Sequence, residues 1–277
     1  MIERMTAVLQ AFDAGSPRLT LAELADRTGL PRSTAHRILD QLVGLRWLEH
    51  SGQSYGLGMR ALELGGLAAS HHELRDIATP LLTQLNQRTG AVASLAVLDR
   101  RDVVYVDRIG RGLSSDAVTR VGGRAPAHAT AAGKAMLAWV SDASLRDSYP
   151  HRLATRTPRT ITTLESLRQD LAQVRLRGGI AYEREEVAQG TVSVAVALRG
   201  GGEARAALQL SGEARTVSLE RLAPFVQEAA RQASRSLFPA PGTRRRSRTV
   251  DRRPQPSPWP PGALERLVQG IGGDYWL

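Results

Sequence analysis

The chain of 277 residues contains no cysteine. This absence excludes a disulfide framework, thiolate zinc sites, iron–sulfur clusters and a cysteine nucleophile. It also lacks any run close to the roughly 18 consecutive apolar residues that a membrane-spanning helix needs. The N-terminus carries early charges and no apolar stretch of the secretory type, so we expect a cytoplasmic protein.

Lysine is almost absent as well, because only Lys134 accompanies the arginines among 37 basic residues. The net charge of +10 is compatible with a nucleic-acid partner, although GC-rich coding also favours arginine. Residues 1–60 hold 7 basic and 6 acidic residues, 61–239 hold 23 and 18, and 240–277 hold 7 and 3. Since the excess is spread along the chain, charge alone does not identify a DNA-binding domain.

The first 60 residues carry the pattern of a helix-turn-helix. Apolar residues recur at spacings of three and four from Ile2 to Phe12, which predicts a first helix. Thr20 and Glu23 form a capping box that opens a second short helix, and Gly29 is suited to end it. A third helix is predicted over 31–42, with Pro31 at its entrance. The expected buried stripe of this third helix is Ala35, Ile38, Leu39, Leu42 and Val43.

The free face of the third helix is polar, as in a recognition helix that enters the major groove. The candidate DNA-contacting residues are Arg32, Ser33, Thr34, Arg37 and Gln41. Arg37 suits a paired contact to guanine, and the two hydroxyls suit phosphate oxygens. Each of them could instead be a solvated surface residue. Two short strands around 51–54 follow and predict a wing.

Beyond the wing, the pattern predicts a connector helix and then an α+β domain. The connector covers 59–69, and a long amphipathic helix covers 74–88. Strands are expected at 91–98, 103–109, 192–198 and 204–211, and helices at 131–140, 164–174 and 219–237. Helices flanking an antiparallel sheet make a sensor-like α+β domain.

The end of the chain differs in composition from the rest. Residues 239–261 hold seven of the 14 prolines, mixed with three arginines at 244–246. Such a segment cannot bury enough apolar surface to offset its chain entropy, so we expect a disordered basic tail. The tail could also tether the protein to DNA or RNA without sequence preference.

Five segments carry a family resemblance. They are GLPRSTAHRILDQL at 29–42, YGLGMRALELG at 55–65, APAHATAAGKAMLAW at 125–139, RGGIAYEREEVAQGTVSVAVAL at 177–198 and AALQLSGEAR at 206–215. With these segments in this order, residues 1–238 resemble the IclR family of bacterial transcriptional regulators.

The resemblance implies an α+β architecture in four parts. These are a winged helix-turn-helix over 1–58, a linker helix over 59–72, a GAF-like α/β effector-binding domain over 73–239 and the tail 240–277, which the family pattern does not cover. It also implies a homodimer or a dimer of dimers on a two-fold symmetric double-stranded DNA operator.

The resemblance further implies a binding site for a small-molecule effector. The positions that match the family's ligand contacts are Ala125, Ala131, Ala132, Glu183, Thr191, Ser193, Gln209 and Ser211. Small residues at 131–132 leave room, and helix N-terminal amides there favour a carboxylate, so we expect a small organic or aromatic acid. Glu183 could bind a ligand hydroxyl or pair with an arginine. His128 could touch the ligand or cap the helix that follows it.

Three positions depart from the family pattern. Arg46 stands where a glycine usually precedes the aromatic residue that opens the wing, and we expect this change to be tolerated. The acidic stretch at 183–186 reads Glu-Arg-Glu-Glu instead of Asp-x-Glu-Glu, and Gln209 replaces a serine. The last two changes touch the expected effector site.

Enzyme motifs are incomplete in this chain. Gly133–Lys134 lacks the first glycine and the final hydroxyl residue of a P-loop, and 71–73 lacks the order of a zinc-binding His-Glu-x-x-His. The glutamates at 183–186 could imitate paired catalytic carboxylates, but a surface cluster at a strand edge is favoured. We therefore expect a ligand-responsive transcription factor with no cofactor, metal or catalytic activity. The alternative is a small-molecule-binding protein or enzyme whose N-terminal module serves assembly.

Overall fold

The structure is a computed structural model that describes residues 1–12, 15–70, 73–113, 119–200 and 202–238. The predicted tail at 240–277 lies outside the described residues, so the expectation of disorder there stays a prediction. No helix in the described ranges is both long and apolar enough to cross a membrane.

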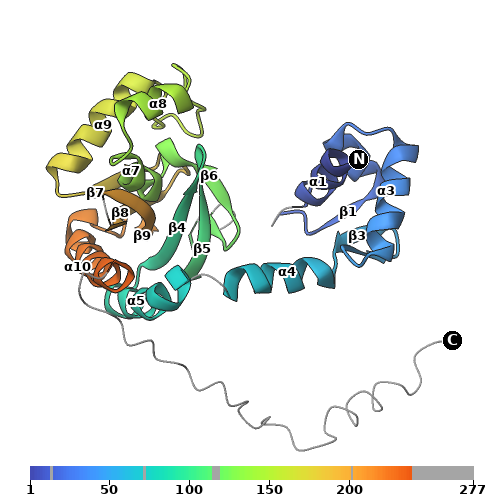
Figure 1. Cartoon of the computed structure of the whole chain (residues 1–277), viewed down its shortest axis with the longest axis horizontal. Helices are drawn as coiled ribbons and strands as arrows, with labels where there is room; N and C mark the ends of the chain where they lie inside the picture. Colours follow the sequence, from blue (N-terminus) through green and yellow to red (C-terminus); the bar gives the residue numbers. More distant parts are fainter. Residues whose placement is uncertain (13–14, 71–72, 114–118, 201, 239–277) are drawn as a thin grey trace, which may run out of the picture. The chain divides into compact units, whose positions relative to one another are not determined.

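The N-terminal module combines three helices with a small antiparallel sheet (Figure 1). Its helices are α1 (Ile2–Gln10), α2 (Leu21–Thr28) and α3 (Arg32–Gly44). Its strands are β1 (Arg18–Thr20), β2 (Leu48–Ser51) and β3 (Ser54–Leu57), in the order β1-β3-β2. The helix-turn-helix and the wing hairpin are confirmed. The third strand, β1, was not predicted, because three residues are too few to show an alternating pattern.

Local capping explains why α2 begins and ends where it does. The Thr20 hydroxyl accepts a hydrogen bond from the Glu23 amide at 3.3 Å, and the Glu23 carboxylate accepts one from the Thr20 amide at 2.8 Å. Gly29 then ends the helix with a left-handed φ of +66°. The predicted stripe of α3 is buried except for Val43, which is half-buried. Ile2 was expected on the apolar face of α1 but is 80% exposed, since it occupies the first position of that helix.

The turn between α3 and the wing contains a strained residue. Arg46 has a φ of +63°, a left-handed conformation that L side chains rarely adopt outside glycine. This geometry accounts for the glycine that is usual at this position in the resemblance described above. Arg46 is therefore accommodated, but at a conformational cost that glycine avoids.

Replacing Arg46 with glycine is expected to raise the free energy of unfolding of the N-terminal module by about 0.5–1 kcal/mol. Urea denaturation followed by circular dichroism measures the change. Arg46→Ala is the matched control, because it removes the same guanidinium but keeps the left-handed strain. If the alanine variant gains as much as the glycine variant, the effect comes from the arginine side chain and not from φ.

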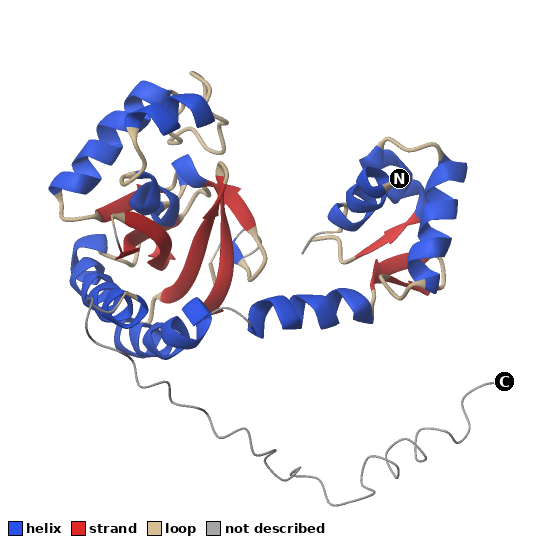
Figure 2. Cartoon of the chain, viewed as in Figure 1, coloured by secondary structure: helices blue, strands red, loops and turns tan. Residues whose placement is uncertain are grey.

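The C-terminal domain is built on one six-stranded antiparallel sheet (Figure 2). The strands β4 (Val92–Asp99), β5 (Asp102–Ile109), β6 (Arg124–Pro126), β7 (Ile180–Arg184), β8 (Thr191–Gly200) and β9 (Glu203–Glu213) lie in the order β6-β5-β4-β9-β8-β7. The helix α4 (Met59–Ser70) precedes this domain and confirms the predicted connector. The strands β6 and β7 were not predicted from their pattern.

Helices cover both faces of this sheet. The helices α5 (Glu73–Thr89) and α10 (Leu219–Leu237) pack on one face. On the other face lies α7 (Ala131–Leu137), with α9 (Leu164–Leu176) packed beyond it. A single 3-10 turn, η1 (Ala127–Ala129), precedes α7, and α8 (Asp142–Ser148) was not predicted. The predicted bounds of α10 are confirmed, whereas α7 ends three residues earlier than predicted.

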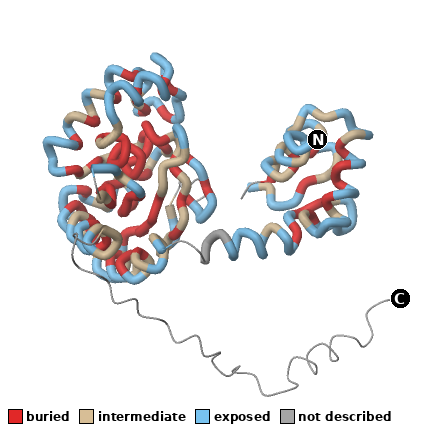
Figure 3. Tube along the Cα trace, viewed as in Figure 1, coloured by how far each residue is buried: buried red, intermediate tan, exposed pale blue. Residues whose placement is uncertain are grey.

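Two apolar cores lie on opposite faces of the sheet. Figure 3 shows the buried residues gathered in the interior of this domain. Leucines and valines of β8 and β9 point toward α5 and α10. Alanines dominate the other face, for example Ala195, Ala197 and Ala207 against α7. Small side chains on that face let α7 approach the sheet closely, which places its first turn over β8 and β9. A second, polar set of residues shares this face.

Candidate functional site

The outer face of α3 presents the predicted polar residues. Arg32, Ser33, Arg37 and Gln41 are exposed, and Thr34 is half-buried. A shallow groove lined by Thr34, Arg37 and Gln41 also includes Arg4, at the start of α1. Arg4 was not predicted, although it lies on the polar side of the apolar pattern of its helix. The arrangement exposes cationic, hydroxyl and amide donors along a single helix, as groove recognition requires.

Asp40 is the one acidic residue on α3. Its carboxylate lies 3.0 Å from Nδ1 of His36, one turn earlier on the exposed side of the helix. This contact holds the carboxylate next to a side chain that is cationic when protonated. The other exposed residues of α3 carry no negative charge, although Glu3 of α1 also lines the groove beside Arg4.

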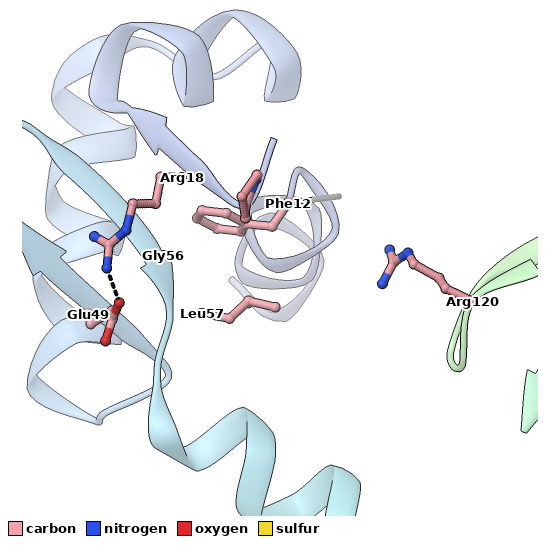
Figure 4. Close-up of a pocket in the computed structure, with 7 residues that line it drawn as sticks. Phe12, Arg18, Glu49, Gly56, Leu57 and Arg120 are labelled. Carbon is pink, nitrogen blue, oxygen red and sulfur yellow. Dashed lines mark hydrogen bonds and ion pairs between the residues drawn. The ribbon is translucent and has the colours of Figure 1, made fainter. Parts of the chain in front are cut away.

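The wing is held by contacts across its short strands. Nη2 of Arg18 on β1 lies 2.5 Å from Oε1 of Glu49 on β2 (Figure 4). Both residues are in register with Gly56 of β3, whose missing side chain leaves space for this ion pair. The rings of His50 and Tyr55 stack with centroids 4.4 Å apart. These contacts support the exposed turn that connects β2 with β3.

In the C-terminal domain, four of the predicted effector residues form one hydrogen-bonded row, and a fifth, Glu183, lies beside it in strand register. The Ala132 amide donates to Oε1 of Gln209 at 3.0 Å, and Nε2 of Gln209 donates to Oγ of Ser211 at 2.9 Å. The Ser211 and Ser193 hydroxyls lie 3.0 Å apart, and Ser193 is in register with Glu183 on β7. The row therefore joins the first turn of α7 to the adjacent strands β8 and β9.

The other three predicted effector residues occupy different surroundings. Ala131 is buried beside Ala132 in the apolar cluster under α7. Ala125 belongs to the same cluster, but it lies on β6, at the opposite edge of the sheet from β7. Thr191 is buried at the start of β8, and its hydroxyl has no hydrogen-bond partner among the described residues.

Glu183 is buried and its carboxylate accepts hydrogen bonds from backbone amides, so the expected surface cluster at the strand edge and the expected arginine pair are both wrong. Binding of a ligand hydroxyl by Glu183 stays a prediction. Its side chain is 1% exposed, and its Oε1 accepts hydrogen bonds from the amides of Glu186 (2.6 Å) and Val187 (3.3 Å). The turn after β7 brings these amides back over the carboxylate, which the sequence pattern did not reveal. Burial raises the pKa of Glu183 to about 7, and the negative charge of Glu186 adds to this effect.

Two buried polar atoms close to this row have no hydrogen-bond partner among the described residues. They are Oε2 of Glu183 and Oγ of Ser94. Ser94 is in register with Gln209 on one side and with Arg108 on the other, so all three share a face. A buried polar atom without a partner is unfavourable, which indicates that these atoms bind a ligand or water.

Ser94, Tyr105 and Arg108 were not among the predicted site residues. Tyr105 is fully buried, and burial raises the pKa of its hydroxyl, with a further increase from the Glu183 charge and an opposing effect of Arg108. Arg108 thus brings a positive charge to the same face as the polar row. The strand β5, which carries Tyr105 and Arg108, was predicted from the sequence. Which of its residues face α7 depends on a bulge in its pairing with β4, between Leu95 and Ala96, and the sequence pattern does not reveal this bulge.

A buried ion cluster lies beside the polar row. Nζ of Lys134 on α7 is 2.7 Å from Oε1 of Glu186 and 3.1 Å from Oδ2 of Asp170 on α9. Lys134 is 1% exposed, and burial raises the pKa of Glu186 while the ammonium group lowers it. The only lysine of the chain is therefore structural, and Glu186 belongs to this cluster and not to a strand-edge patch.

His128 does not cap α7, so that expected role is wrong, and contact with a ligand stays a prediction. Nε2 of His128 lies 2.9 Å from the carbonyl oxygen of Ala154, and its ring is buried. Burial lowers the pKa of His128, so the neutral ring is favoured. The cap of α7 is instead Thr130, whose hydroxyl accepts a hydrogen bond from the Gly133 amide at 3.0 Å.

Comparison with known proteins agrees with both halves of this architecture. Residues 1–52 match the family described as "IclR helix-turn-helix domain", and residues 66–237 match "Bacterial transcriptional regulator IclR C-terminal". The chain is 35% identical over 248 residues to the HTH-type transcriptional regulator XynR of Escherichia coli, covering 86% of this chain and 98% of that protein. It is 34% identical over 246 residues to the Pca regulon regulatory protein of Pseudomonas putida, covering 86% and 84%.

A solved structure is similar over the same range. An IclR homolog from Microbacterium hydrocarbonoxydans, complexed with 4-hydroxybenzoate, superimposes with a TM-score of 0.73 and 30% identity. The match covers 85% of this chain and 98% of the other. Together with the exposed polar face of α3 and the polar row beneath α7, these matches show that the chain belongs to the IclR family of bacterial transcriptional regulators.

Proposed function

We propose that this DNA-binding regulator acts as a homodimer on a two-fold symmetric operator, and that a small aromatic acid bound in its C-terminal domain changes its affinity for that operator. The observation that carries the proposal is the exposed face of α3, where Arg37 and Gln41 stand clear of the module's core. Because such a regulator acts on genomic DNA, we place it in the cytoplasm. We assign the predicted residues Arg32, Ser33 and Thr34 to the phosphate contacts at the start of this helix.

The polar row under α7 is the proposed effector site. Arg108 supplies a positive charge, and the Ala132 amide lies at the N-terminus of α7, which favours an anionic group. Ala131 and Ala132 have small side chains, and we propose that the Gln209 side chain turns aside to admit an aromatic ring beside them. A relative of this chain was crystallised with 4-hydroxybenzoate, which carries such a ring and a carboxylate.

The proposed effector site is expected to depend on pH through Glu183. Its pKa of about 7 means that the carboxyl group is largely protonated below pH 7 and ionised above it. A protonated Glu183 donates a hydrogen bond from Oε2, whereas an ionised one repels a carboxylate ligand. Binding of 4-hydroxybenzoate to the full chain should therefore weaken severalfold as the pH rises from about 6 to about 8. Isothermal titration calorimetry at several pH values measures this dependence.

Glu183→Gln is the matched variant for this prediction, because an amide donates a hydrogen bond at every pH. We expect its affinity for 4-hydroxybenzoate to stay nearly constant across the same range. Lys134, Glu186 and Tyr105 also surround the carboxyl group, so a slope that persists in Glu183→Gln assigns the titration to one of them and contradicts the prediction. Operator binding in the absence of any acid reports separately on the DNA-binding half of the proposal.

The helix α4 supports the proposed dimer. Leu62, Leu64 and Leu67 on this helix are 69%, 44% and 58% exposed, which is unusual for three leucines within two turns. We expect Leu62→Asp with Leu67→Asp to shift sedimentation toward the monomer and to weaken operator binding about tenfold or more, because a monomer loses the second half-site. Leu176→Asp on α9 is the control, since Leu176 is 79% exposed and lies on a different helix. An unchanged dimer in the double variant would rule out α4 as the interface.

The alternative is a protein that binds or converts a small molecule and uses its N-terminal module only for assembly. Members of this family are transcriptional regulators, and we infer that this chain acts by binding and not by catalysis. Loss of operator binding with intact 4-hydroxybenzoate binding in an α3 variant would exclude that alternative.

A further inference from the structure

A groove on the C-terminal domain, formed by residues that belong to neither site above, brings three arginines together. It lies between α10 and the end of β8, beside the glycine turn at 178–179, and has a volume of about 450 Å³. Arg231 and Arg235 come from α10, and Arg199 comes from β8. Among the described residues that line this groove, none is acidic.

The α10 side of the groove is a regular stripe. The residues of this stripe are spaced by four, three and one positions, so they lie along one side of the helix. They are Gln227, Arg231, Ser234 and Arg235. Nη1 of Arg231 lies 3.5 Å from Oε2 of Glu228, but both side chains are more than half exposed, so this pair is weak. The groove therefore keeps a net positive charge and several hydrogen-bond donors.

The opposite wall of the groove is aromatic. The guanidinium carbon of Arg199 lies 3.2 Å from the ring centroid of Trp139, which follows α7. Nε of Arg199 and Nε1 of Trp139 are buried, and within the described ranges neither has a hydrogen-bond acceptor. The Arg199 amide donates to Oγ of Ser234 at 3.3 Å, which ties β8 to α10 at this point. Two buried donors without acceptors are unfavourable, and an anion at the groove would supply acceptors to them.

We propose that this groove binds a small phosphate-bearing metabolite. Arg199, Arg231 and Arg235 surround the phosphate, because planar guanidinium groups bind phosphate oxygens in pairs of hydrogen bonds. The organic part of the ligand lies against the Trp139 side and the small apolar residues of the floor, Val196, Ala197 and Ala230. The groove volume falls within the range of about 300–1,000 Å³ that is usual for small-molecule sites. This second site is independent of the proposed effector site and of operator binding.

Titration of the full chain with adenosine monophosphate and with inorganic pyrophosphate tests the proposal. Calorimetry should show saturable binding of both probes, with tighter binding of the nucleotide, and Trp139 fluorescence should change on binding. Arg231→Gln with Arg235→Gln is expected to weaken both probes about tenfold or more, since each removes charge-assisted hydrogen bonds. Trp139→Phe identifies the fluorescence signal among the four tryptophans of the chain.

Arg221→Gln is the matched control, because Arg221 is also exposed on α10 but does not line the groove. Circular dichroism and operator binding establish that each variant is folded. Absence of saturable binding of either probe to the wild-type chain would overturn the proposal. Equal affinity of the wild type and the double variant for the probes would also overturn it. So would pyrophosphate binding as tightly as the nucleotide, because the organic part of the ligand would then make no contact.

Discussion

Replacing Arg37 and Ser33 together with alanine is expected to lower the affinity for the operator by about two orders of magnitude, because a paired arginine–guanine contact contributes about 1–3 kcal/mol in each half-site. Both side chains are exposed on α3, and neither belongs to the buried stripe of Ala35, Ile38 and Leu39. The module should therefore keep its fold. Fluorescence anisotropy with a duplex obtained by selection from random sequences measures the loss.

Two controls make the result specific to the α3 face. Arg205→Ala removes an exposed arginine from β9 and is expected to leave operator affinity unchanged. Binding to a random duplex should fall much less than binding to the operator, since non-specific affinity depends on total phosphate contacts. If the double variant discriminates operator from random DNA as well as the wild type does, α3 is not the helix that reads the bases.

Replacing Lys134 with alanine is expected to lower the free energy of unfolding by about 3–5 kcal/mol, because it removes one partner from a buried ion cluster. Glu186 and Asp170 would then face each other without the ammonium group that lies 2.7 Å and 3.1 Å from them. Burial already raises the pKa of Glu186 in the presence of Lys134. Chemical denaturation followed by circular dichroism measures the change.

The pH dependence of this loss has a definite sign. Removing Lys134 is expected to raise the folded-state pKa of Glu186 further above its ordinary value of 4.5. Above pH 4.5 the carboxyl group ionises in the unfolded chain but stays protonated in the folded one, which lowers the free energy of unfolding. The deficit should therefore be largest near neutral pH and shrink as the pH falls toward 4.5. Lys134→Met combined with Glu186→Gln and Asp170→Asn removes every charge and should recover most of the stability. A decrease of less than about 1 kcal/mol in the free energy of unfolding of Lys134→Ala would contradict the prediction and show that water reaches the cluster.

The helix-turn-helix could be predicted because its signals are local. The capping box of Thr20 and Glu23, the left-handed Gly29 and the apolar spacing within 31–42 all act over a few residues. The exposed polar face of α3 follows directly from that spacing, so the DNA-contacting candidates needed no tertiary information. The bounds of α10 were equally accessible, since it is a long helix with a clear apolar stripe.

The proposed effector site could be predicted from the sequence only in part. The resemblance supplied Gln209, Ser193 and Ser211, and strand alternation explains why they share a face. It did not supply Ser94 or Arg108, which come to that face through pairing between strands that the sequence pattern does not specify. Such pairings join residues far apart in the chain, and no local propensity encodes them.

Local sequence was thus sufficient for the elements that bind DNA, because capping and periodicity act within one or two turns of a helix. Packing determined the chemistry of the other domain. Burial under a returning turn raises the pKa of Glu183 to about 7, and contact with α9 makes Lys134 structural. The strain at Arg46 and the groove beside Arg199 likewise depend on the backbone path and on neighbours distant in sequence. Desolvation and strain are properties of an environment, so they are determined only once the chain has folded.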